Sequence, residues 1–325
     1  MSSRRNGRKD APSSAAAGGK KAKTDATSAS SIAPPVNAIK KGTDSEGKEY
    51  ADLNDLWKAE FEDPDATPDA AAADAAASSA AGAPVKKSLA WYQKGAGYWA
   101  SQAASVDGVL GGFGHVSPVD IAGSKAFLAS IPGGVKYGSA IDCGAGIGRI
   151  SKGLLAPLFK FVDLVEQDPK YVAKAREYCA GLASMRDFVV EGLQSFGFPR
   201  GSYDVIWIQW VIGHLPDRDF VPFMERASAA LAPGGVICLK ENIAKKGFVM
   251  DLDDQSVTRT DAQYRELFEK SNLELVATEL QKNFPSVLFP VRMYALRPKA
   301  SAADAAQAAP AAAAGAASTP ATMEA

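Results

Sequence analysis

Two groups of polar residues in this chain are suited to acid–base chemistry: an imidazole and a run of carboxylates. His214 follows the apolar stretch 203–208, and an imidazole that titrates near neutral pH suits proton transfer. Segment 250–256 holds three aspartates, and Asn242 stands shortly before it. Carboxylates clustered at the mouth of a pocket attract a cationic substrate. Spacing alone leaves two plainer alternatives open, a structural histidine and an ordinary solvated acidic loop.

A glycine-rich loop is the second feature with chemical meaning. A short apolar run ends in Asp142, and glycines follow at positions 144, 146 and 148. Such glycines let the backbone turn sharply at a strand end and approach a ligand closely. A dinucleotide fingerprint would require glycine at position 149, where Arg149 stands, so the spacing favours an adenosyl cofactor without a pyrophosphate. Glu166, about 20 residues further on at a strand end, can accept the ribose hydroxyls; a tight turn with a surface acid is the alternative.

Alternating strands and helices are expected to position these residues. Apolar runs predict strands that end near 142 and span 161–165, 187–190, 203–208, 236–239, 273–280 and 287–296. Helices are predicted after the glycine loop and at 117–132, 169–182, 219–232 and 261–271. A polar loop is expected at 241–260. This alternation indicates an α/β fold with a mostly parallel sheet covered on both faces.

Both ends of the chain differ in composition from the middle. Residues 1–87 and 299–325 are rich in alanine, serine, aspartate and proline, and have too few large apolar residues to offset the entropy of ordering. We therefore predict two disordered tails around one folded domain at 88–298. Within the first tail, residues 50–61 place apolar side chains at helical spacing. The plainer interpretation is a stray amphipathic piece, and the other is a transient helix or docking motif.

Composition narrows the class of protein. The net charge is −1, so no overall positive field attracts nucleic acid. The three cysteines lie far apart and there are two histidines, which argues against a disulfide framework or a metal centre. No apolar run is long enough for a membrane span, and the N-terminus lacks the apolar core of a signal peptide. We expect a cytoplasmic protein without a membrane partner; the sparse basic pairs at 4–5 and 20–21 make the nucleus a second candidate compartment.

Two strings identify a family. DCGAGIGRI at 142–150 and YDVIWIQWVIGHL at 203–215 closely resemble the eukaryotic protein N-terminal methyltransferases. The resemblance extends over about 90–297 and includes VDGVLGGFGHV at 106–116. It implies a seven-stranded, Rossmann-like, S-adenosylmethionine-dependent methyltransferase with an N-terminal helical addition and a late hairpin over the substrate peptide. The implied reaction is mono-, di- or trimethylation of the α-amino group of proteins that begin X-Pro-Lys or X-Pro-Arg once methionine is removed.

The resemblance also assigns roles to individual residues. Those implied for the cofactor are Gly144 and Arg149 at the methionine portion, Glu166 at the ribose, Leu193 and Gln194 at the adenine, and Gln209 completing the site. Those implied for the substrate N-terminus are Trp99, Trp210, Asn242, Asp251, Asp254 and Ser256. Asp254 and His214 are the candidate bases. Phe289 departs from the family, which tends to have tyrosine there, so a hydroxyl contact to the peptide is expected to be missing.

The implied reaction sets a physical requirement. An α-amine is mostly protonated at pH 7, and an ammonium has no lone pair with which to attack a methyl sulfonium. A base must therefore stand close to the amine. Two other functions are left open. The first, a methyltransferase of this fold for a small molecule or RNA, would not need the acidic loop or Asn242; the second is a catalytically silent cofactor-binding protein, which would be expected to have lost Arg149, Asp254 or His214.

Overall fold

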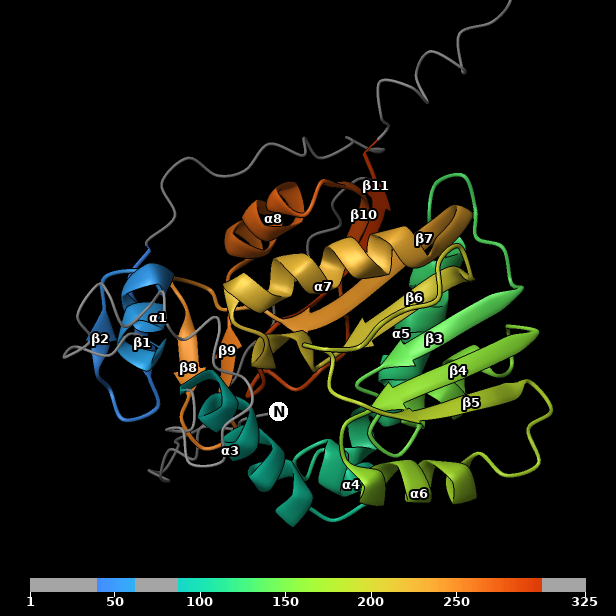
Figure 1. Cartoon of the computed structure of the whole chain (residues 1–325), viewed down its shortest axis with the longest axis horizontal. Coiled ribbons are helices and arrows are strands. Elements are labelled where there is room, and N and C mark those ends of the chain that lie inside the picture. Colours follow the sequence, from blue (N-terminus) through green and yellow to red (C-terminus); the bar gives the residue numbers. More distant parts are fainter. Residues whose placement is uncertain (1–39, 62–86, 300–325) are drawn as a thin grey trace, which may run out of the picture.

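The computed structural model describes residues 40–61 and 87–299 (Figure 1). The tails predicted at 1–39, 62–86 and 300–325 lie outside the described residues. A seven-stranded sheet forms the centre, in the order β10-β11-β7-β6-β3-β4-β5. Its strands are β3 (Ser139–Cys143), β4 (Phe161–Glu166), β5 (Met185–Val190), β6 (Tyr203–Gln209), β7 (Leu231–Asn242), β10 (Leu273–Leu280) and β11 (Val291–Pro298). Strand β11 runs antiparallel to both neighbours and the other pairs are parallel, so the predicted α/β fold is confirmed.

Helices cover both faces of this sheet, as the sequence predicted. They are α3 (Lys87–Ser101), α4 (Val106–Val109), α5 (Ser117–Ser130), α6 (Pro169–Tyr178), α7 (Asp217–Ala230) and α8 (Asp261–Lys270). Three of them begin at side-chain caps: Ser105 accepts from the Gly108 amide at α4, Asp168 accepts from the Lys170 amide at α6, and Thr260 forms a reciprocal capping box with Gln263 at α8. Helices α3, α4 and α5 precede the first strand of the large sheet and make up the expected N-terminal helical addition.

The core follows from the alternation of side chains along the strands. In β6, Val205 and Trp207 belong to an apolar cluster that includes Phe127 of α5. Ile206, on the opposite face, belongs to a cluster with Phe220 of α7. All five side chains are buried. A strand buried on both faces explains why this stretch of sequence is apolar without interruption.

Strand order places the switch point of the sheet beside β3. From β3 the chain adds β4 and β5 on one side, and then returns to add β6 and β7 on the other. Ligands of open α/β sheets bind in the crevice at the carboxyl ends of the strands at such a point. The glycine loop 144–148 follows β3 at this edge. The helix expected directly after it is a single five-residue π turn, Ser151–Leu155.

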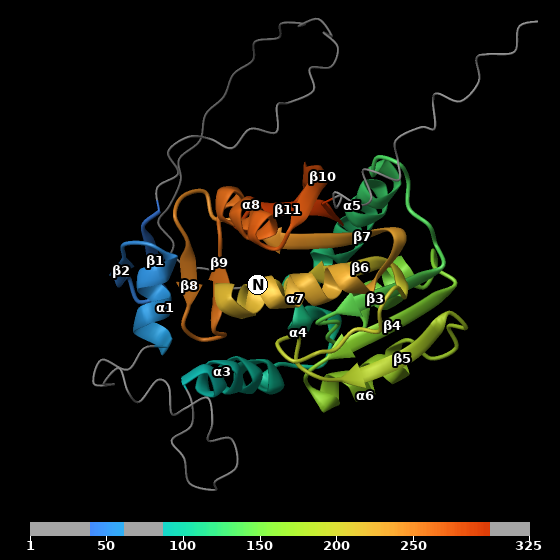
Figure 2. The same ribbon diagram turned by 45° about the horizontal axis from the view of Figure 1, so that its top comes forward.

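The predicted first tail is wrong for residues 40–61. These residues form β1 (Gly42–Asp44), β2 (Glu49–Tyr50) and α1 (Leu53–Phe61), which lie at one end of the molecule in both views (Figures 1 and 2). Their apolar side chains pack against a third cluster around Trp91 and Phe248. Neither partner is near in sequence, so local composition could not reveal the docking.

The predicted polar loop at 241–260 is also wrong in part. Strand β7 continues to Asn242, and the chain then forms a hairpin of β8 (Val249–Asp251) and β9 (Ser256–Thr258). With β1 and β2 it makes a four-stranded sheet in the order β2-β1-β8-β9. The acidic segment is therefore the tip of a hairpin whose first strand is paired by β1.

Candidate active site

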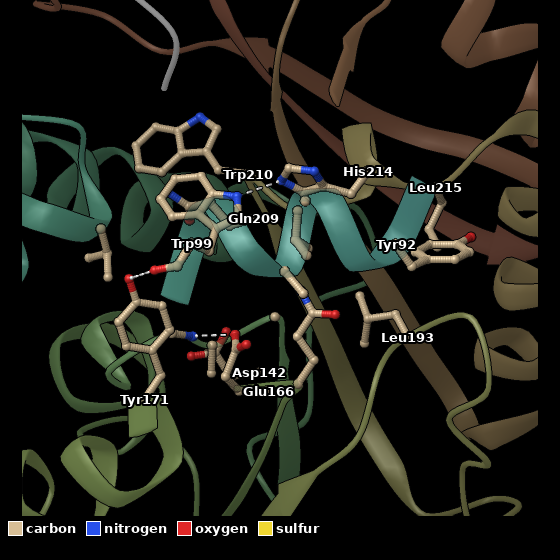
Figure 3. A pocket seen from close by; sticks show the side chains of 18 of the residues that line it. Tyr92, Trp99, Asp142, Glu166, Tyr171, Leu193, Gln209, Trp210, His214 and Leu215 are labelled. Carbon is tan, nitrogen blue, oxygen red and sulfur yellow. Dashed lines mark hydrogen bonds between the residues drawn. The ribbon is translucent and has the colours of Figure 1, made fainter. Parts of the chain in front are cut away.

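A cavity of about 1070 Å³ opens at the switch point, between the carboxyl ends of the strands and helix α3. Figure 3 shows Trp99, Trp210 and His214 on one side of it, with Asp142 and Glu166 opposite. The lining combines the glycine loop with aromatic side chains and a few polar groups, as expected of a small-molecule site.

The glycine loop owes its shape to left-handed backbone conformations. Gly144, Gly146 and Gly148 have φ of 68°, 55° and 77°, where other residues are strained. A Cβ on Gly144 would also lie 2.4 Å from a methyl group of Val211. Below the loop, the buried carboxylate of Asp142 accepts from the Ser151 amide at 2.8 Å and hydroxyl at 2.7 Å. The loop is thus held between β3 and the turn that follows it.

Glu166 stands at the end of β4 and lines the cavity. Its Oε2 accepts from the Gly146 amide and its Oε1 from the Asp168 amide, each at 3.0 Å. Burial raises the pKa of this carboxyl, and the backbone donors partly oppose that shift. A carboxylate oxygen can accept more than one hydrogen bond, so Glu166 remains able to hold a ribose hydroxyl. Leu193 and Gln194 line the same cavity.

Arg149 belongs to a buried network of charges under the cavity. Its Nη1 donates to Asp120 at 2.7 Å, and Asp120 is fully buried. Lys240, also fully buried, forms an ion pair with the same carboxylate at 2.5 Å. Gln209 donates its amide to Asp120 at 2.9 Å and accepts from the Trp207 indole. Two cations share the carboxylate of Asp120, so Asp120 alone does not neutralise Arg149, and Asp142 is a second carboxyl near the guanidinium.

A second, smaller cavity of about 420 Å³ adjoins the first and shares Trp99, Trp210 and His214 with it. Three buried polar atoms belong to side chains that line it: Oδ1 of Asp254, Oε2 of Glu241 and Nε1 of Trp210. None of the three has a hydrogen-bond partner among the described residues. Buried polar atoms are ordinarily paired. Two free acceptors and one free donor around one cavity therefore indicate a ligand with both donors and acceptors.

The hydrogen bonds of His214 define its protonation state. The Trp99 indole Nε1, which can only donate, lies 3.2 Å from His214 Nε2. Nδ1 lies 3.1 Å from the carbonyl oxygen of Gln255, which can only accept. The consistent assignment is a neutral imidazole with its proton on Nδ1. The lone pair of Nε2 faces Trp99 between the two cavities.

Trp210 is held in an unusual conformation. Its φ is 54°, in the left-handed region, which costs about 1 kcal/mol or more for a residue with a Cβ. This turn brings its ring over the guanidinium of Arg149, with 5.3 Å between Cζ and the ring centroid. Strain of this kind clusters at functional sites, where the surroundings enforce it. The ring forms part of the wall between the two cavities.

Burial shifts two carboxyls of the second cavity toward the protonated form. It raises the pKa of Glu241 to about 7, and the amide of Asn242 only partly opposes this. It also raises the pKa of Asp254, with nearby His214 and Ser256 acting in the opposite direction. Carboxyls with raised pKa values accept a proton more readily at neutral pH, as a general base for an ammonium requires.

Twelve of the thirteen residues singled out from the sequence line one of the two cavities. Asn242, Ser256, Asp254 and Phe289 line the second. Asp251 lines neither; its Oδ1 accepts from the Asp253 amide in the hairpin.

Three polar residues were missed by sequence reasoning: Glu241, Lys240 and Asp120. Lys240 and Glu241 directly continue the apolar run 236–239, and charged residues in line with a buried strand could have drawn attention to them. Asp120 had no such signal.

The sheet order, the glycine loop and the cavity at the switch point are those expected of an S-adenosylmethionine-dependent methyltransferase, and the family match shows that the chain belongs to this class. Within that class, the chain belongs to the family described as AdoMet-dependent proline di-methyltransferases, whose model matches residues 87–297. The chain is 43% identical over 267 residues to alpha N-terminal protein methyltransferase 1 of Arabidopsis thaliana, covering 78% of this chain and 90% of that protein. It is 43% identical over 219 residues to N-terminal Xaa-Pro-Lys N-methyltransferase 1 of Xenopus tropicalis, covering 66% and 98%.

A solved structure supports the same assignment. A SAM-dependent methyltransferase from Leishmania major superposes with a TM-score of 0.71 at 37% identity, covering 82% of this chain and 99% of that one. The expected enzyme class and cofactor are confirmed by these matches. In the part of the chain that the structure describes, no helix is long and apolar enough to cross a membrane. The same residues contain no cluster of three or more histidine, cysteine or acidic side chains arranged to hold a metal ion.

Proposed function

We propose that this enzyme methylates the α-amino group of proteins that begin Xaa-Pro-Lys or Xaa-Pro-Arg. The observation that carries the proposal is the pair of buried, unpartnered carboxyl oxygens, on Asp254 and Glu241, in the cavity next to the cofactor site. An α-ammonium is a compact cation with three N–H donors. The two buried carboxyl oxygens can accept hydrogen bonds from these N–H donors.

For the cofactor, the proposal assigns the larger cavity. Arg149, which lines this cavity and shares its partner Asp120 with Lys240, is assigned to the carboxylate of the methionine portion. Glu166 is assigned to the ribose, Leu193 and Gln194 to the adenine, and Gly144 to close backbone contact. Bound S-adenosylmethionine supplies an electrophilic methyl group. The polar atoms of Gln209 are already paired inside the protein, so its role is to hold Asp120 and to fill the wall.

For the proton, Asp254 is assigned as the first acceptor. Its free Oδ1 and raised pKa let it bind the ammonium and take one proton from it, which exposes the lone pair of the amine. His214 is assigned as the second acceptor, because its Nε2 carries a lone pair that Trp99 covers and can release. Alignment of the amine between the two cavities then supplies most of the rate.

For the rest of the peptide, Asn242 and Ser256 are assigned to backbone groups near the N-terminus, since both line the second cavity. The free Nε1 of Trp210 is a donor for a peptide carbonyl. Asp251, outside the cavity on the hairpin, is assigned to the basic side chain at the third position of the substrate. Proline at the second position fixes the backbone and lowers the entropy lost on binding.

Mass spectrometry tests the proposal. The protein is incubated with S-adenosylmethionine and a hexapeptide that begins Ser-Pro-Lys-Arg, and additions of about 14 Da per methyl group are expected on the free α-amine. The same peptide with an acetylated N-terminus is the control and should gain nothing. Methylation of the acetylated peptide, or of neither, would reject the proposal.

A small-molecule or RNA substrate is the competing proposal. The acidic hairpin beside the second cavity repels phosphates, which disfavours RNA. Methylation of RNA or of a small amine by the purified protein, with the hexapeptide inert, would favour this alternative.

A further inference from the structure

Residues 40–61 pack on the hairpin and helix of the substrate side of the enzyme, and none of them lines either cavity. Apolar side chains of this segment, Tyr50, Leu53 and Leu56, are buried in one cluster with Met250 and Val257 of the hairpin. None of residues 40–61 lines either of the two cavities. The segment therefore acts on the site only through the elements it packs against.

The first of these elements is the acidic hairpin. Strand β1 pairs in parallel with β8, with Thr43 opposite Val249. The hydroxyl of Ser45 accepts from the Leu252 amide at 3.2 Å, inside the acidic segment itself. On its other side β8 pairs only with β9, a strand of three residues. Two short strands alone make a marginal hairpin; β1 supplies the further strand that holds the acidic tip in place.

Two glycines show that this docking is close-fitting. A Cβ on Gly42 would lie 2.4 Å from the ring of Phe248, and a Cβ on Gly247 would lie 1.6 Å from the carbonyl oxygen of Lys41. The backbones meet where a side chain would keep them apart. The Thr43 amide donates to the Phe248 carbonyl at 3.1 Å in the same place. Residues 41–43 and 247–248 therefore form a close-fitting interface between the two segments.

The second element is helix α3, which carries Trp99. Trp57 and Phe61 of α1 pack on the ring of Trp91 in α3, each with centroids 5.6 Å apart. The Trp91 indole donates to the carbonyl oxygen of His214 at 2.8 Å. One aromatic contact thus joins the segment to both the helix of Trp99 and the backbone of the candidate base.

We propose that residues 40–61 are a positioning segment of the substrate site, which clamps helix α3 to the β8–β9 hairpin and affects affinity for the peptide more than affinity for the cofactor. The proposal rests on the proposed function of the second cavity. It follows from the geometry because the segment packs directly on the hairpin of Asp254 and on the helix of Trp99, and reaches His214 through Trp91. None of its own residues lines the larger cavity, which it reaches through Trp91 of helix α3.

The test uses single substitutions in the full-length chain. Leu56 is fully buried, so Leu56→Asp should undock the segment. Ala59→Asp adds the same charge to the exposed face of α1 and is the matched control. For Leu56→Asp, the KM for the hexapeptide should rise about tenfold or more, and the Kd for S-adenosylhomocysteine should rise by a smaller factor, about threefold or less. Ser45→Ala, which removes one hydrogen bond without disturbing the core, should raise the KM about threefold.

Amide hydrogen exchange gives a readout that does not depend on turnover. In Leu56→Asp, amides of residues 249–258 should exchange faster than in Ala59→Asp, with amides of β3 unchanged. The proposal would be wrong if Leu56→Asp left exchange in the hairpin or the KM for the peptide unchanged. It would also be wrong if the variant lost affinity for the cofactor and for the peptide equally. If the unaltered enzyme methylates no peptide but the exchange pattern is as expected, the proposed substrate fails and the clamp stands.

Discussion

Asp254 and Glu241 face the same cavity but differ in their surroundings. Asp254 lies beside His214 and Ser256, whereas Glu241 has one oxygen on the amide of Asn242 and the other without a partner. Burial raises the pKa of both. Asp254 has the imidazole of His214 close by, which can take a proton from it, whereas the neighbouring carboxyl of Glu241 is Asp254 itself.

Asp254→Asn tests this division of roles. The amide keeps the size of the side chain but cannot take a proton, so kcat for the hexapeptide should fall by about 100-fold or more. The Kd for S-adenosylhomocysteine, measured by calorimetry, should change by less than about twofold, because Asp254 lines only the second cavity. A parallel loss of cofactor affinity would assign Asp254 a structural role.

Lys240→Met tests the buried charge network. Methionine nearly matches lysine in shape but removes one of the two cations that share Asp120. Asp120 then pairs with Arg149 alone, which leaves less of the guanidinium charge for the cofactor carboxylate, and affinity for S-adenosylhomocysteine should fall about tenfold. Methylthioadenosine, which has the same nucleoside but no amino-acid carboxylate, should bind as before. Equal losses for both ligands would show that the substitution disturbs packing and not charge.

Among the elements, the glycine loop sets the floor of the cofactor cavity. Gly144→Ala should abolish detectable binding of S-adenosylhomocysteine, because the new methyl group meets Val211 at 2.4 Å while the backbone stays left-handed. Gly181→Ala is the matched control: its φ is 81° and no atom lies within 4 Å of the new Cβ. The control should lose about 1 kcal/mol of stability and no cofactor affinity. Strong binding by Gly144→Ala would show that the loop adapts.

The hairpin and helix α3 form the opposite wall. They bring Trp99 within reach of His214, and the Tyr171 hydroxyl of α6 donates to the carbonyl oxygen of Trp99 at 2.8 Å. Figure 3 shows these side chains converging from separate elements. The substrate site is thus assembled from segments far apart in sequence, in contrast to the contiguous glycine loop.

Across the whole molecule, buried acids tie stability to pH. The folded state raises the pKa of Glu241 from 4.5 to about 7. The folded protein therefore binds more protons than the unfolded chain between these values, and this carboxyl's contribution to stability falls as pH rises from about 4.5 to 7. Glu241→Gln removes that term, so its stability relative to the unaltered enzyme should increase as pH rises.

Urea unfolding at pH 5 and pH 8 measures the effect. The free energy of unfolding of Glu241→Gln, minus that of the unaltered enzyme, should be larger at pH 8 by an amount on the order of 1 kcal/mol or more. Glu177→Gln, on the exposed face of α6, is the control and should show no such change. An equal difference at both pH values would mean that Glu241 titrates as it does in water.

Local sequence was sufficient to predict the glycine loop and the central strands beside it. Strand β6 is apolar throughout because both of its faces are buried, and the loop 144–148 is rich in glycine because its backbone is left-handed. In each case the residues that the structure requires are neighbours in the chain, so a short stretch of sequence is enough to predict the feature. The same strings were long enough to identify the family.

The sequence by itself determined the α/β order, the glycine loop and the acidic segment, because each depends on residues close together in the chain. Only the tertiary structure decided that residues 40–61 pair with the hairpin, that Asp120 joins Arg149 to Lys240, and that Glu241 is left with a free oxygen. These features depend on partners 29 to 207 positions apart. Charge pairing, burial and strand docking at such separations leave no periodic trace in sequence, and they decide what the second cavity can bind.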